Sequence, residues 1–235
     1  MTETKRIDEI KSNIDIINDS LATAAGRAGR NMSDIQLMAV SKTKPVEDIQ
    51  AAYDAGQRLF GENRIVEACE KFAQLPSDAE LHMIGHLQSN KAATAAKCAS
   101  CVQSIDKLST ARELNKRAAA LDRNIDFLIE INTSGEGSKS GYNGIDAVYN
   151  DLESYLDLSN LTLRGLMTIA PFTDDQAAVR KSFRDLYGYY IRLNTELSGG
   201  LDILSMGMSS DFEIAVEEGS TLIRVGTAIF GSRNY

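Results

Sequence analysis

Apolar positions along this chain follow two periods, one typical of helices and the other of buried strands. In residues 4–25 they recur at spacings of three and four, which predicts an amphipathic helix. After residue 31, short apolar runs predict strands at residues 37–41, 58–61, 81–85, 101–105, 125–132, 161–170, 203–206 and 222–230. Helical patterns fill the gaps, and one of them, over residues 108–121, has Asp106 in the position of a cap.

This alternation predicts the fold class. Strands that alternate regularly with helices form a parallel sheet with right-handed crossovers. Eight strands within 235 residues favour a single (β/α)8 TIM barrel over an open sheet, with an extra helix at the N-terminus. Only three prolines occur, and no Pro- or Gly-rich linker divides the chain. We therefore expect one α/β domain over residues 1–235, with the helix in 1–30 and the barrel in 36–231.

Composition narrows the function classes. Hydrophobic residues make up 43% and charged residues 25% of the chain, as in ordinary globular proteins. The net charge of −8, with no basic block, argues against nucleic acid as a partner. No apolar signal-peptide core follows the first methionine, and no apolar run approaches the roughly 18 residues of a membrane span. We expect a cytoplasmic protein that does not bind membranes.

The cysteines and histidines do not predict a metal site. Cys69, Cys98 and Cys101 are an odd number without a disulfide framework. The CxxC spacing of 98–101 resembles a redox or metal half-site, but no second pair or nearby histidine completes it. His82 and His86 have no cluster of cysteines or carboxylates beside them. We interpret the cysteines as structural, and we predict no metal.

Lys42 is the strongest chemical signal in the chain. It follows the apolar strand at 37–41 and precedes a turn that ends at Pro45. Screening from water and the second cation Lys44 would both favour the neutral amine, which is the form that attacks a carbonyl. A solvated surface lysine is the alternative interpretation. The pattern suggests a lysine that forms a Schiff base with an aldehyde.

Polar residues gather where the later strands end, and in a barrel these ends meet at one mouth. The short turn at 207–211, with Ser209, precedes a helical run and can offer backbone N–H groups to an anion. Gly226 and Thr227, after the last strand, can add a second set. A lysine opposite a phosphate site suits pyridoxal 5′-phosphate (PLP), whose aldehyde and phosphate lie at different positions of one ring.

Arg224 shares a strand face with Leu222 and Gly226, so it is expected to point into the mouth. A guanidinium only donates hydrogen bonds. Facing the pyridine nitrogen, it would keep that nitrogen unprotonated and weaken the ring as an electron sink. An ion pair with Asp211 or Glu218 is the alternative. Met206, at the end of its strand, is either a cofactor contact or core filling.

Seven ordered motifs within about residues 36–231 resemble those of the pyridoxal phosphate homeostasis proteins. The motifs are Ala39-Val-Ser-Lys-Thr-Lys-Pro45, Gly61-Glu-Asn63, His82-Met-Ile-Gly-His-Leu-Gln-Ser-Asn-Lys91, Ser134-Gly-Glu-Gly-Ser-Lys-Ser-Gly141, Arg164-Gly-Leu-Met-Thr168, Leu204-Ser-Met-Gly-Met-Ser209 and Arg224-Val-Gly-Thr-Ala-Ile-Phe-Gly231.

The resemblance implies a PLP fold-type III barrel, similar to the N-terminal domain of alanine racemase. It implies PLP on Lys42 as an internal aldimine and Arg224 at the pyridine nitrogen. It also implies that the phosphate lies near Ser209, Gly226 and Thr227, with Asn63 and His86 close to the cofactor. Members of this family influence vitamin B6 pools without an established catalytic turnover, so no catalytic residue is assigned, and PLP-dependent apoenzymes are possible recipients of the cofactor.

Two enzyme hypotheses stay open beside the carrier. A fold-type III amino-acid racemase needs bases on both faces of the α-carbon. The partner-derived base of alanine racemase depends on a C-terminal domain that we expect this protein to lack, and Tyr142 or Tyr149 is the available substitute. A phosphosugar enzyme with a catalytic Lys42 would need an acid–base such as Glu62 or Glu130. Without the racemase dimerisation domain, we expect a monomer.

Overall fold

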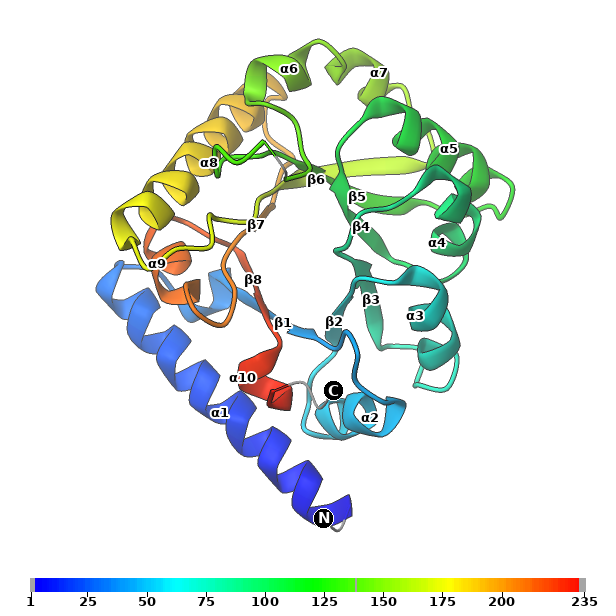
Figure 1. The fold of residues 1–235 in the computed structure, drawn as a ribbon. Coiled ribbons are helices and arrows are strands. Elements are labelled where there is room, and N and C mark those ends of the chain that lie inside the picture. The colour runs from blue at the N-terminus through cyan, green and yellow to red at the C-terminus, as the bar shows by residue number, and fades with distance from the viewer. Residues whose placement is uncertain (1–2, 138, 233–235) are drawn as a thin grey trace.

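The computed structural model describes residues 3–137 and 139–232, which form a closed barrel of eight parallel strands inside a layer of helices (Figure 1). The strand order around the barrel follows the sequence. The strands are β1 (Gln36–Val40), β2 (Leu59–Glu62), β3 (Glu80–Met83), β4 (Cys101–Ile105), β5 (Ile125–Glu130), β6 (Leu161–Met167), β7 (Ile203–Ser205) and β8 (Leu222–Val225). The predicted barrel is confirmed.

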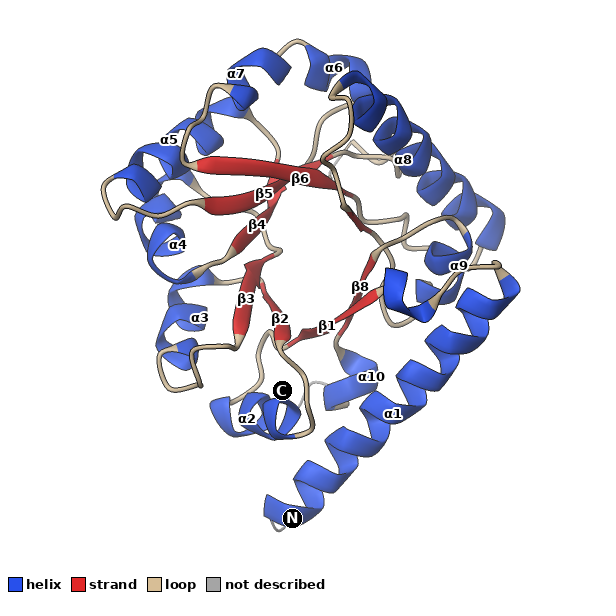
Figure 2. Cartoon of the chain, turned by 180° about the vertical axis from the view of Figure 1, so that it is seen from behind, coloured by secondary structure: helices blue, strands red, loops and turns tan. Residues whose placement is uncertain are grey.

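The described helices alternate with these strands and surround them, as the view from behind shows (Figure 2). They are α1 (Glu3–Arg27), α2 (Val46–Asp54), α3 (Ile65–Phe72), α4 (Ala92–Cys98), α5 (Leu108–Ala119), α6 (Ile145–Tyr149), α7 (Leu152–Leu156), α8 (Gln176–Glu196), α9 (Phe212–Glu217) and α10 (Thr227–Phe230), with 3-10 turns η1 (Met32–Asp34) and η2 (Ser89–Lys91). None of the described helices is long and apolar enough to cross a membrane.

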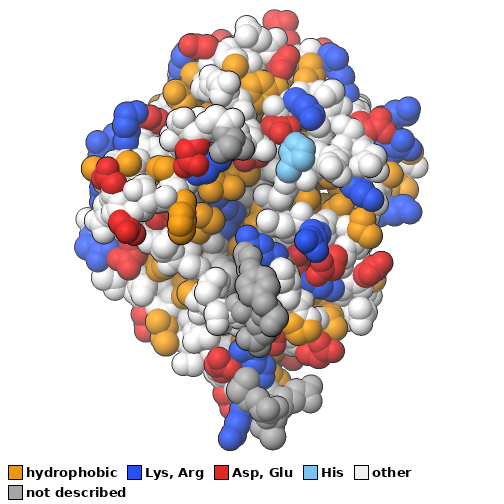
Figure 3. Space-filling model, in the orientation of Figure 1, with side chains coloured by type: hydrophobic (Ala, Val, Ile, Leu, Met, Phe, Trp, Pro, Cys, Tyr) orange, Lys and Arg blue, Asp and Glu red, His pale blue; other side chains and the backbone are white. Residues whose placement is uncertain are grey.

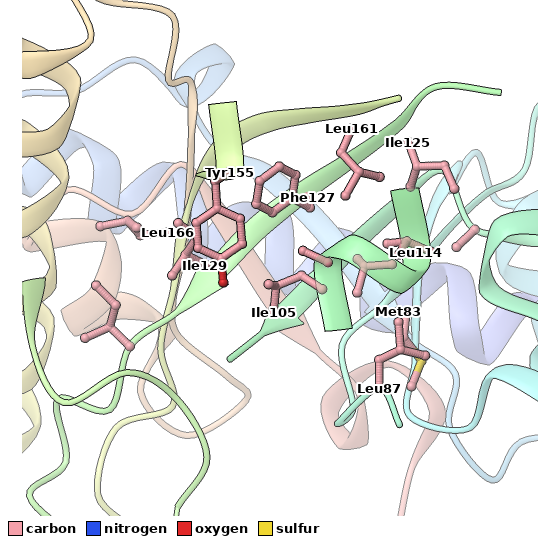
Figure 4. Close-up of a cluster of buried hydrophobic side chains, with 14 of the residues drawn as sticks. Met83, Leu87, Ile105, Leu114, Ile125, Phe127, Ile129, Tyr155, Leu161 and Leu166 are labelled. Atoms are coloured by element: carbon pink, nitrogen blue, oxygen red, sulfur yellow. The ribbon is translucent and has the colours of Figure 1, made fainter. Parts of the chain in front are cut away.

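The hydrophobic core lies between the strands and the helices, because alternate strand residues point outward. Phe127 and Ile129 of β5 pack there with Tyr155 of α7 and Leu114 of α5 (Figure 4). The Phe127 and Tyr155 ring centroids are 5.5 Å apart. A smaller apolar layer inside the barrel contains Cys101, Leu128 and Met167.

The predicted N-terminal helix is α1, which lies outside the barrel beside α2, α9 and α10 (Figure 1). Its apolar positions are buried, as the spacing requires: Ile10, Ile14, Ile17 and Leu21. Arg6 extends this contact by pairing with Asp48 of α2, at 2.8 Å, and by donating to the carbonyl of Phe230 in α10, also at 2.8 Å. The helix therefore holds the last element of the described barrel in place.

Two expectations about local elements were wrong. The strand predicted at 222–230 ends at Val225, and Thr227–Phe230 forms the helix α10. Strand alternation fails there because Ile229 and Phe230, adjacent in sequence, are both buried. The residue before α5 is Lys107, which makes no side-chain capping bond. Asp106 is paired with His86 instead, at 3.1 Å.

The cysteine prediction also needs correction. Cys69 of α3 and Cys98 of α4 form a disulfide, with Cα atoms 5.6 Å apart, and Cys101 is buried and free. Consecutive βα units place α3 and α4 side by side, so the pairing joins neighbours in space. The CxxC spacing drew attention to Cys98 and Cys101, which are not bonded to each other.

Candidate functional site

A cavity of about 450 Å³ opens at the carboxyl ends of the strands. Figure 3 shows this end of the molecule, with Lys and Arg side chains around the hollow at its centre. The cavity brings together most of the predicted site residues: Lys42, Asn63, Ser209, Arg224, Gly226 and Thr227. Its volume lies within the usual range of about 300–1,000 Å³ for small-molecule sites.

Lys42 is aimed into the cavity by a tight turn. The turn is closed by a hydrogen bond from Lys44 N to Ser41 O, of 3.0 Å. Thr43 adopts a positive φ of 67° in it, which is unfavourable for a β-branched residue. Such strain is found where the chain must present a functional group. Ser41 donates to Glu62 at 2.9 Å, which ties the turn to the end of β2.

Lys44 lines the cavity as well, but its ammonium caps α10. Its Nζ donates to the carbonyls of Phe230 and Gly231, both at 3.1 Å, and of Ser232, at 3.2 Å. A cation at the carboxyl end of a helix satisfies carbonyls that lack an intrahelical donor. Lys44 therefore orders the segment that begins with Gly226 and Thr227.

Arg224 points into the barrel, as strand alternation predicted, and only 4% of it is exposed. Its Nη1 donates to Ser205 Oγ at 2.6 Å, and its Nη2 donates to Thr168 O at 2.8 Å. Burial lowers the pKa of the guanidinium to about 10, against the opposing effect of Asp211 and Glu130. Arg224 therefore stays charged at neutral pH and only donates.

A buried polar chain continues from Arg224 across the barrel interior. Ser205 donates to Gln103 Oε1 at 2.6 Å, and Gln103 Nε2 lies 2.8 Å from His82 Nδ1. Burial lowers the pKa of His82 to about 4, and the charge of Arg164 acts in the same direction. Gln103 was missed by the sequence analysis, although a glutamine inside a fully buried strand is a recognisable signal.

Part of the cavity lining is suited to an anion. Ser209, Ser210 and Thr227 present hydroxyl groups to it, and the first N–H groups of α10 have no intrahelical acceptor. A Cβ on Gly226 would lie 3.1 Å from Val40 O, so a larger residue would crowd this part of the lining. Asp211, in the same turn as Ser209, accepts from Met208 N at 2.5 Å, and burial raises its pKa.

Glu62, the acid proposed for a phosphosugar enzyme, is held away from such a role. It is 1% exposed, accepts from Ser41, and pairs with Lys71 at 3.3 Å. Burial raises its pKa, while Lys71 and Ser41 oppose the shift. Its position supports the Lys42 turn.

Several other predicted residues lie elsewhere. His86 is at a smaller neighbouring cavity with Glu130. Met206 is fully buried in the hydrophobic core, and Met208 lines the main cavity instead. Tyr142 donates to Asp151 at 2.6 Å, away from the cavity. Tyr149 lies beneath the guanidinium of Arg192.

The quoted motif at 134–141 includes Ser138, which lies outside the described residues. Within the described part of the chain, no cluster of three or more His, Cys, Asp and Glu side chains is placed to hold a metal ion.

Comparisons of the sequence with a family model and with known proteins agree on one family. The model of the alanine racemase N-terminal domain matches residues 9–234. The pyridoxal phosphate homeostasis protein of Pasteurella multocida is 42% identical over 231 residues, which cover 96% of this chain and 98% of that protein. The protein of the same name from Escherichia coli is 40% identical, covering 97% of this chain and 99% of that one.

Solved structures agree with this relationship. PipY of Synechococcus elongatus with PLP bound superposes with a TM-score of 0.79 at 37% identity, covering 92% of this chain and all of that one. Alanine racemase of Clostridium difficile shares the fold, with a TM-score of 0.78 at 15% identity over 97% of this chain and 58% of that one. The chain belongs to the alanine racemase N-terminal domain family and, within it, to the pyridoxal phosphate homeostasis proteins.

Proposed function

We propose that this protein binds PLP in the cavity at the mouth of the barrel and acts in PLP homeostasis as a carrier. The observation that carries the proposal is the convergence of an amine, a guanidinium and an anion site on one cavity, from Lys42, Arg224 and the Ser209–Thr227 region. PLP carries an aldehyde, a ring nitrogen and a phosphate, which these three groups match. The related protein PipY has been solved with PLP bound.

Each residue has a role in this proposal. The cofactor supplies an aldehyde that condenses reversibly with a lysine amine, and Lys42 is the lysine on the described lining whose turn is anchored to β2. Arg224 has donors left after its bonds to Ser205 and Thr168, since a guanidinium carries five. Ser209, Gly226 and Thr227 hold the phosphate, and Asn63, which lines the same cavity, also contacts the cofactor. His86 lies further out, in the neighbouring cavity.

The chemistry of the lining favours a carrier over a racemase. A donor-only guanidinium at the ring nitrogen opposes its protonation, which weakens stabilisation of a carbanion. Among the residues that the structure describes, the titratable groups on the cavity lining are the cations Lys42, Lys44 and Arg224. Tyr142 and Tyr149, the substitutes for a second base, lie outside it. We infer binding and release without a catalytic cycle.

Phe172 is fully exposed at the rim of the cavity, where an apoenzyme that receives PLP could contact it. We propose a monomer in the cytoplasm, organised as one barrel domain with its N-terminal helix. Light scattering after size-exclusion chromatography tests the monomer, with a mass of 25.6 kDa expected.

Absorbance spectroscopy tests the cofactor. The protein mixed with PLP should show a visible band that borohydride fixes onto Lys42, as located by peptide mapping. Lys42→Ala should lose the band, and Lys91→Ala, which changes an exposed lysine, should retain it. A full band in Lys42→Ala, or no band in the unmodified protein, would overturn the assignment.

A further inference from the structure

A second cavity, of about 230 Å³, adjoins the proposed PLP cavity and shares Asn63, Ile84 and Ile169 with it. It lies at the carboxyl ends of β3, β5 and β6. Its polar lining includes Glu130, His86 and Lys139. The proposed carrier function assigns no ligand to this space.

Glu130 is the unusual residue of this second cavity. It lies at the last position of β5 and is only 6% exposed, yet its side chain lines the cavity. Within residues 3–137 and 139–232, no hydrogen bond or ion pair engages its carboxyl group. A buried carboxylate without a partner is costly, so its retention facing a cavity points to a ligand that donates to it.

The backbone around Glu130 is held firmly, so the carboxyl group is preorganised. Tyr142 N donates to Glu130 O at 2.8 Å, and Asn132 N donates to Tyr142 O at 3.0 Å. Gly141 makes this return of the chain possible, because a Cβ there would come within 2.7 Å of Asn132 N. Its φ of +112° also suits glycine alone.

Charges of both signs lie near Glu130. Asp106 adds a second carboxylate and pairs with His86, whereas one of its oxygens, Oδ1, is buried without a described hydrogen-bond partner. Lys139 already donates to Ala170 O at 2.8 Å and pairs with Glu136 at 3.0 Å. Two of the three protons of the Lys139 ammonium are thus accounted for. The third is left for the carboxylate group of a ligand in this cavity.

We propose that this second cavity binds the primary ammonium group of a small amino acid or amine, with Glu130 as its acceptor. An ammonium carries three donors and would supply the hydrogen bonds that Glu130 lacks. The shared lining places such a ligand beside the Lys42 cavity.

The pH dependence of ammonium binding follows from the surroundings of Glu130. Burial raises its pKa to about 7, Asp106 acts in the same direction, and Arg224 opposes the shift. His86 and Lys139 are the other charged or titratable groups on the lining. Only the ionised carboxylate pairs with an ammonium, so affinity should rise between pH 6 and 8 and level off above that.

The test is a calorimetric and NMR titration of the full-length chain without cofactor, a state in which the related PipY has also been solved. The probes are L-alanine, ethylamine and L-lactate, in which a hydroxyl replaces the ammonium. We expect L-alanine to bind and L-lactate to fail. Equal binding of ethylamine would identify a simple amine as the ligand class, and weaker binding would identify an amino acid.

Variants locate the site. Glu130→Gln should weaken binding of L-alanine by at least about tenfold, the effect of losing one charged hydrogen bond. Glu153→Gln, which changes an exposed glutamate of α7, should bind as the unmodified protein does. The proposal is overturned if Glu130→Gln binds normally, if L-lactate binds as well as L-alanine, or if neither amine binds at 100-fold molar excess over millimolar protein.

The PLP proposal and this one fail separately. The titration needs no cofactor, and Lys42→Ala should lose the PLP band while its affinity for L-alanine is retained. Loss of the band in the unmodified protein would leave the ammonium site standing, and loss of amine binding would leave PLP binding standing.

Discussion

Arg224 Nη1 lies 2.6 Å from Ser205 Oγ, and this contact sets the direction of every hydrogen bond beyond it. A guanidinium only donates, so Ser205 accepts from Arg224 and gives its own proton to Gln103 Oε1. The Gln103 amide then donates to His82 Nδ1, which places the histidine proton on Nε2. Arg224 is thereby oriented by side chains from three other strands.

Ser205→Ala should destabilise the protein by about 1–3 kcal/mol, because it leaves buried Arg224 and Gln103 groups without partners. Denaturant unfolding measures this loss. Ser205→Thr retains the hydroxyl and should recover most of it. Equal stability of Ser205→Ala and the unmodified protein would show that the hydrogen bonds of Ser205 to Arg224 and Gln103 do not contribute to stability.

The neutral state of His82 makes stability depend on pH. Its folded pKa of about 4 lies below the unfolded value of 6.5, so the unfolded state binds a proton first as pH falls. The contribution of His82 to the unfolding free energy is fully present above pH 6.5 and is lost as the pH falls toward 4. The total loss below both pKa values is about 3 kcal/mol. His82→Gln does not titrate, and its unfolding free energy should fall less over this window than that of the unmodified protein.

The ionisation of Glu130 should change the stability of the protein with pH in the opposite direction. Its folded pKa of about 7 lies above the unfolded value of 4.5, so the buried charge costs nothing below pH 4.5 and up to about 3 kcal/mol above pH 7. Glu130→Gln should therefore be more stable than the unmodified protein at pH 8, with the difference shrinking at pH 4.5. A constant difference between these pH values would contradict the burial of an unpaired carboxyl group.

Thr43→Gly should raise stability by about 1 kcal/mol. Glycine accepts the φ of 67° without strain, and this relief exceeds the added freedom of the unfolded chain. Thermal unfolding compares the variant with Thr43→Ala, which keeps a Cβ and should gain little. Lower stability of the glycine variant would show that the turn is unstrained.

Removing the disulfide between Cys69 and Cys98 should cost about 3 kcal/mol, since it closes a loop with a sequence separation of 29 residues. The double variant Cys69→Ser, Cys98→Ser should match the unmodified protein measured under reducing conditions. Oxidised and reduced protein of equal stability would argue that the cysteines are not bonded in solution.

Much of the fold follows from the sequence alone, because it depends on local periodicity. The spacing of Ile10, Ile14 and Leu21 is sufficient to predict α1, and β4 begins and ends at the predicted residues. The barrel also determines that Lys42 and Arg224 meet at one mouth, since the carboxyl ends of parallel strands lie together. Each of these inferences needs only the periodic pattern of apolar and polar residues that are close together in the sequence.

Contacts between distant residues were decided by the tertiary structure. The disulfide joins Cys69 and Cys98, and the ammonium of Lys44 reaches the carbonyl of Phe230, far along the chain. No local pattern predicts that Glu130 is buried and that its carboxyl group lacks a partner among the described residues, because this depends on what the other strands place around it. Sequence period determines which face a side chain occupies, whereas the packing of separate segments determines what it meets there.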